Sequence, residues 1–75
     1  MTRSMEHVRE WLLHHGDVCR AVLAERQPER AAVALRFAVV DARSRGELPD
    51  VDVRDVDWTY LVLDLPHIAS KAAAG

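Results

Sequence analysis

The chain has only one cysteine, Cys19, so no disulfide can form within it. A small domain without disulfides needs another source of stability, such as a metal or an oligomeric interface. A lone thiol is typical of a reducing compartment. The first ten residues also lack the continuous apolar core of a signal peptide. We therefore expect a cytoplasmic protein.

A strong charge of either sign is also missing. Ten basic and twelve acidic residues give a net charge of −2, which is far from the basic surface of a nucleic-acid-binding domain. Nine of the ten basic residues are Arg, and Ala and Val are abundant. This bias is typical of a high-GC bacterial genome, and we do not interpret the arginines as a phosphate-binding set.

No apolar run is long enough to span a bilayer. The longest, residues 31–42, is interrupted by Arg36 and Asp41. As a helix this segment is apolar nearly all round, so it needs cover on more than one side. A chain of 75 residues has little material for that cover and buries only roughly 60–65% of its unfolded surface. We expect a partner to supply the cover, and a second copy of the chain is the simplest one.

The spacing of apolar residues predicts an all-α fold in a single domain, residues 1–75. Apolar positions three and four apart predict a helix over 4–26. Gly16 could divide this helix or kink it; one kinked helix is favoured because the spacing continues in phase across it. Pro28 and Gly46 bound a second helix over 28–44, which completes an antiparallel hairpin.

The remainder of the chain is expected to be less regular. Residues 47–57 form an acidic linker whose aspartates lack the glycine and glutamate of an EF-hand loop. A short third element follows at 58–65. An aspartate cap favours a helix there, whereas the residue types favour a strand, and we prefer the helix. Pro66 is expected to end this element, and residues 70–75 are expected to be a frayed tail.

His15 and Cys19 are the strongest candidates for chemistry. Because they are four residues apart on a predicted helix, they share a face, and two such pairs across a dimer would give four zinc ligands. The simpler interpretation makes His15 a partly buried polar residue and Cys19 a small core residue. Catalysis by the pair lacks an orienting third group and oxyanion donors. We expect no enzyme activity, no metal and no cofactor.

The function expected from these features is a non-enzymatic helical interaction module. It would act as a homodimer or as a small subunit of a larger assembly, without nucleic acid, membrane or small-molecule substrate. One alternative is a small dimeric DNA-binding regulator or antitoxin-like protein, in which Gly16 separates two helices and Arg20 and Arg26 contact DNA. A second alternative is a metal-responsive dimer that uses His15 and Cys19. The residues expected at the interface are Trp11, Leu12, Leu35, Phe37, Val39, Val40 and Trp58.

Overall fold

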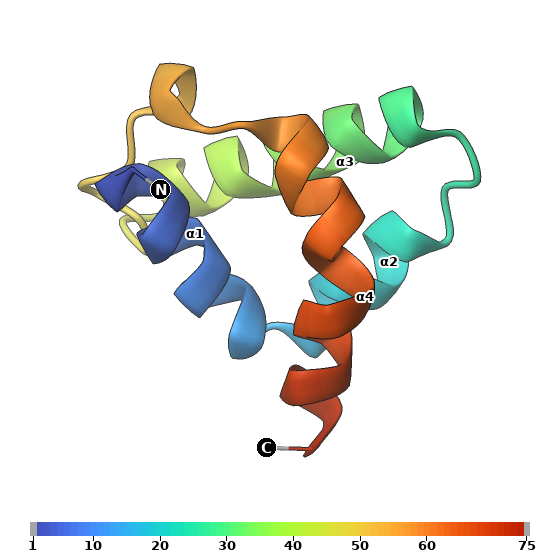
Figure 1. The fold of residues 1–75 in the computed structure, drawn as a ribbon. Helices are drawn as coiled ribbons and strands as arrows, with labels where there is room; N and C mark the ends of the chain where they lie inside the picture. The colour runs from blue at the N-terminus through green and yellow to red at the C-terminus, as the bar shows by residue number, and fades with distance from the viewer. Residues whose placement is uncertain (1, 75) are drawn as a thin grey trace.

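A computed structural model describes residues 2–74, and within this range every regular element is helical. The elements are α1 (Arg3–Leu13), α2 (Gly16–Leu23), α3 (Pro28–Ser44), the short 3-10 helix η1 (Val53–Asp55) and α4 (Trp58–Ala74). Figure 1 shows α4 lying across the other helices, and α4 packs against all three of them. The all-α fold class is thus confirmed.

Helix α3 has the bounds that its sequence predicts. Gln27 has an extended backbone, and Pro28 occupies the first turn, where its missing N–H costs no hydrogen bond. The helix ends at Ser44, and Gly46 follows with a φ of 82°, which a residue with a Cβ rarely adopts. Local sequence signals therefore determine both ends of α3.

The first predicted helix is in fact two helices, so the expectation of one kinked helix over 4–26 was wrong. α1 ends at Leu13, and α2 begins at Gly16. Both helices pack against α4, so each needs its own apolar face, and apolar spacing that continues in phase does not require one continuous helix. A Cβ placed on Gly16 would lie 3.7 Å from the Cβ of Ala72, so the start of α2 approaches the end of α4 closely.

Helix α4 is longer than the predicted third element, because it continues through Pro66 to Ala74. The expected end at Pro66 was therefore wrong, and residues 70–74 are helical rather than frayed, while residue 75 lies outside the described range. Pro66 is exposed and cannot donate the hydrogen bond that normally continues a helix. Leu65 and Ile68 on either side of it are fully buried, and their burial offsets that loss.

The core lies between α4 and the other three helices. α4 contributes Leu61, Leu65 and Ile68, all fully buried. The linker at 47–57 adds three more buried apolar residues: Leu48, Val51 and Val56. None of the helices within residues 2–74 is both long and apolar enough to cross a membrane.

Polar contacts attach the 47–57 linker to the start of α1 and cap the helices beside it. The Ser4 hydroxyl accepts a hydrogen bond from the backbone N–H of Asp52 at 2.9 Å. Thr2 caps α1, since its hydroxyl accepts from the Met5 N–H at 3.1 Å. Asp57 caps α4 by accepting from the Tyr60 N–H at 3.0 Å. The acidic linker is therefore a packed connection.

Candidate functional site

One face of α3 carries three exposed apolar side chains. Val33, Phe37 and Val40 are 54%, 72% and 41% exposed, and their spacing of four and three residues aligns them along the helix. We call these three residues the α3 stripe. On the opposite face, Leu35 and Val39 are fully buried. The chain thus covers one side of this apolar helix and leaves the other side open.

A shallow groove lies beside the N-terminal half of the α3 stripe. Val33, Ala34 and Phe37 give it an apolar surface, and its remaining lining residues are Glu25, Glu29 and Arg30. An open groove of this kind can receive an apolar side chain, while its charged lining residues can meet polar groups at the rim of an interface.

Exposed charges flank the α3 stripe. Glu29, Arg30, Arg36 and Arg43 are exposed, and none of them forms an ion pair with another residue of the described range. Asp41, by contrast, pairs with Arg45 within the chain. Glu29, Arg30 and Arg36 are therefore available to a partner, while Arg43 also lines a groove with Asp50 and Asp52 without forming an ion pair there.

The structure divides the residues expected at the interface into two groups. Most of them belong to the chain's own core: Trp11, Leu12, Leu35 and Val39 are buried, and Trp58 is half-buried against the core. Phe37 and Val40 are exposed. The buried group offers no surface to a partner, because the other helices cover it. An interface role for Phe37 and Val40 stays a prediction.

Val33 belongs to the exposed face but was missing from the expected interface. Its position in line with Phe37 and Val40, away from Leu35 and Val39, is the sequence signal that could have identified it. Three other large apolar residues are exposed: Leu23 on α2 is 40% exposed, and Tyr60 and Leu63 on α4 are 48% and 74% exposed. Tyr60 and Leu63 are three residues apart and form a pair on α4, which is shorter than the α3 stripe of three residues.

His15 and Cys19 lie in different surroundings. Cys19 is fully buried, and its thiol donates to the Leu12 carbonyl at 3.4 Å. Burial raises the pKa of this thiol, which disfavours the thiolate needed for metal binding or nucleophilic attack. His15 precedes α2 and stacks on the Trp11 ring, with 4.2 Å between ring centroids. Within residues 2–74 no group of three or more histidine, cysteine or acidic side chains could hold a metal.

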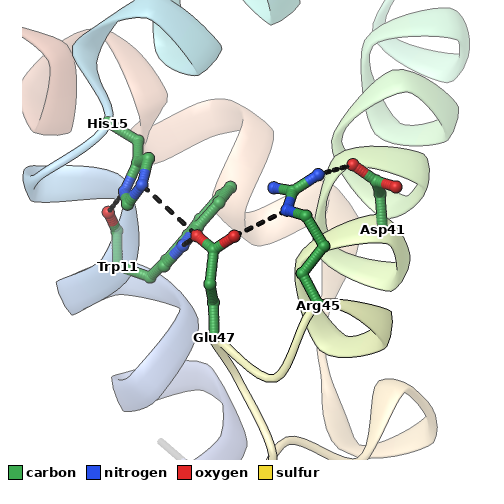
Figure 2. A network of polar contacts seen from close by, with 5 residues as sticks. All are labelled: Trp11, His15, Asp41, Arg45 and Glu47. Carbon is green, nitrogen blue, oxygen red and sulfur yellow. Dashed lines mark hydrogen bonds and ion pairs between the residues drawn. The ribbon is translucent and has the colours of Figure 1, made fainter.

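His15 belongs instead to a polar network that sequence reasoning missed (Figure 2). Its Nδ1 donates to the Trp11 carbonyl at 2.7 Å, and its Nε2 lies 3.6 Å from Glu47 Oε1. The same Glu47 oxygen accepts from Trp11 Nε1 at 3.1 Å, and its other oxygen accepts from Arg45 Nε at 2.6 Å. Arg45 also pairs with Asp41.

Glu47 is the centre of this network. Its hydrogen bond from Arg45, followed by that from Trp11, lowers the pKa of the Glu47 carboxyl group. The network attaches the segment after α3 to the junction of α1 and α2. A groove next to it is lined by His7, Glu10, Trp11 and residues 47–50, and it contains no activated nucleophile. These contacts hold the fold together and leave the α3 stripe as the candidate functional surface.

Comparison with protein-family models, with curated proteins and with solved structures gave no match. The functional interpretation therefore depends on the residues of this chain alone.

Proposed function

We propose that this chain is a small, non-enzymatic helical module that acts through protein–protein contact at the α3 stripe. It works as a homodimer or as a small subunit of a larger assembly. The observation that carries the proposal is the exposure of Phe37, which is 72% exposed in line with Val33 and Val40. Contiguous apolar surface of this kind marks interaction sites, and large aromatic residues are frequent anchors of interfaces.

The energetics support a contact centred on Phe37. Burial of an exposed Phe side chain contributes about 1.5–3 kcal/mol, so placing an Asp there should weaken the contact by about 10- to 150-fold. The same change costs the isolated chain little, because Phe37 lies outside its core.

Native mass spectrometry of the purified chain tests the proposal. We expect the wild-type chain to be recovered with a mass greater than that of one chain. Phe37→Asp should be recovered as a single chain with unchanged helix content. Leu63→Asp is the matched control, because Leu63 is equally exposed but lies on α4, and it should keep the wild-type assembly.

Two outcomes would contradict the proposal. A wild-type chain that remains single at about 100 µM, well above a micromolar Kd, and that binds no other polypeptide through this face has no partner there. An assembly that survives Phe37→Asp uses another surface.

The break between α1 and α2 favours the DNA-binding alternative, since α2 and α3 have the order and short connection of a helix-turn-helix unit. The net charge of −2 and the apolar centre of the exposed α3 face count against it. Salt-dependent binding of duplex DNA that is lost when Arg20 and Arg26 are changed would favour this alternative.

A further inference from the structure

We infer that the partner at the α3 stripe is a second copy of this chain, with the two α3 helices antiparallel about a two-fold axis near residue 35. This inference rests on the proposed function. It adds the identity of the partner, the orientation of the two helices and the pairs of charges that meet.

The exposed face of α3 has the spacing of a helix-pairing seam. Arg30, Val33, Phe37, Val40 and Ser44 follow one another at intervals of three, four, three and four residues, and all are exposed. This is the alternation by which one helix packs along another. The seam runs through nearly the whole of α3, so it suits a second helix of similar length.

One antiparallel register matches the shape of this surface. When the Phe37 side chain of one copy packs against Val33 of the other, it enters the groove beside Val33 and Ala34. The two-fold axis repeats the same contact in the opposite direction, so that both Phe37 rings are covered. Ala34 of each copy then lies near the axis, where its small side chain permits close approach of the helices.

The same register matches the charges. Glu29, Arg36 and Arg43 each come directly before a seam residue, so they lie along one flank of the seam. In an antiparallel pair this flank of one copy faces the same flank of the other copy. Glu29 of one copy thus lies opposite Arg43 of the other, and the symmetry gives this pair twice. Both side chains are exposed and form no ion pair within the described chain. Arg36 lies beside its own symmetry mate at the rim, where water and salt screen the repulsion.

Other pairings of the seam fit less well. Moving the antiparallel register by one heptad in one direction places Arg36 opposite Arg43, so like charges meet twice. Moving it in the other direction places Glu29 opposite Arg36, but Phe37 then lies opposite residue 26, before the start of α3 at Pro28, and loses its contact with Val33. A parallel pair places the two Arg30 side chains against each other in the seam. It also separates Glu29 of one copy from Arg43 of the other by about 21 Å along the helix, at 1.5 Å per residue. Only the first register covers both Phe37 side chains, fills the groove beside Val33 and also places Glu29 opposite Arg43.

The area available predicts a weak dimer. α3 has 17 residues and is about 25 Å long, and only the three residues of its stripe offer exposed apolar surface, so we expect a small interface that dissociates readily. We therefore expect a Kd on the order of micromolar. The dimer should dissociate on dilution.

A charge-swap experiment tests this arrangement. Glu29→Arg alone and Arg43→Glu alone each place like charges together twice in a homodimer, so each should weaken self-association by about tenfold. When the two variants are mixed, the new Arg at position 29 of one variant faces the new Glu at position 43 of the other. The second pair joins the unchanged Glu29 and Arg43. A heterodimer of near wild-type affinity is then expected. Native mass spectrometry resolves it, because the two variants differ in mass.

The control mixes Glu29→Arg with Arg54→Glu. Arg54 lies on η1 and pairs with Asp52, so a change of charge there should give no preferred heterodimer. Circular dichroism checks that each variant stays helical. Variants that merely unfold would show no rescue on mixing.

The three ways of failing differ in meaning. If the wild-type chain binds a different polypeptide at the α3 stripe, the second copy is refuted and the proposed function stands. If it forms a dimer but the mixed variants show no preference for each other, the antiparallel arrangement is refuted. If it stays a single chain at high concentration, the second copy is refuted, and if it also binds no other polypeptide at the α3 stripe, the proposed function fails as well.

Discussion

Leu35→Ala and Phe37→Ala should differ sharply in their effect on the free energy of unfolding, although the two residues are two positions apart on α3. Leu35 is fully buried and Phe37 is 72% exposed. Truncation of a buried Leu to Ala costs about 2–5 kcal/mol. A surface substitution usually changes stability by less than about 0.5 kcal/mol.

The loss at Leu35 is large compared with the total stability. At about 0.05–0.15 kcal/mol per residue, a domain of 75 residues has about 4–11 kcal/mol of unfolding free energy. A loss of about 3 kcal/mol would lower Tm by about 12–24 °C. Leu35→Ala should thus be partly unfolded near 37 °C, whereas Phe37→Ala should unfold like the wild type when each is a monomer.

Urea unfolding followed by circular dichroism measures both effects, provided that the chain is dilute. At about 1 µM, near or below the expected Kd, the monomer dominates. At a concentration of 100 Kd, binding adds about 2.7 kcal/mol to the wild type and should add nothing to Phe37→Ala. Leu63→Ala is the control that keeps this concentration dependence.

The reasoning would be refuted if Phe37→Ala lost as much stability at 1 µM as Leu35→Ala. Phe37 would then belong to the core of the chain, and the α3 stripe would not be a free surface. If the urea midpoint of the wild type does not depend on concentration, the α3 stripe is still an exposed surface, but self-association at that surface is refuted.

Two further predictions concern the interior and the polar network. Glu47→Gln removes the ion pair with Arg45. Folding lowers the pKa of Glu47 from its usual value near 4.5. The ionised Glu47 therefore stabilises the fold above pH 4.5, and this stabilisation is lost as the pH falls through the lower pKa of the folded chain. The difference in Tm between wild type and Glu47→Gln should therefore be largest near pH 7 and shrink below pH 4.5, and a constant difference would refute the ionic role. Cys19 is buried with a raised pKa, so a thiol reagent should modify it only at the rate of unfolding, and fast modification of the native chain would place the thiol at the surface.

The parts of the fold that could be predicted from the sequence are those with local signals. Pro28 and Gly46 define α3 because the backbone preferences of Pro and Gly act within one or two residues. The sequence offered a division at Gly16 as one of two possibilities but did not select it, because apolar spacing that continues in phase is compatible with one helix and with two helices that each pack on α4. The path of α4 through Pro66 was missed for a related reason, because burial of Ile68 overrides a local preference.

The candidate site shows the same limit. The sequence indicates two apolar faces on α3, one with Leu35 and Val39 and one with Val33, Phe37 and Val40. Which face stays open depends on where α4 packs, and α4 was expected to be much shorter. The contacts of Glu47 with Trp11 and Arg45 also arise only when the segment after α3 folds back on α1.

The two faces of α3 contribute differently to folding and association. The core face holds α3 in place, so a change such as Leu35→Ala should weaken the proposed dimer as well, because the stripe exists only while α3 is folded. The exposed face contributes little to the isolated chain, so Phe37→Ala should weaken the dimer without unfolding the monomer. A partner that binds the α3 stripe therefore stabilises the whole domain by mass action, and the state of assembly sets how much stability a chain of this size retains on dilution.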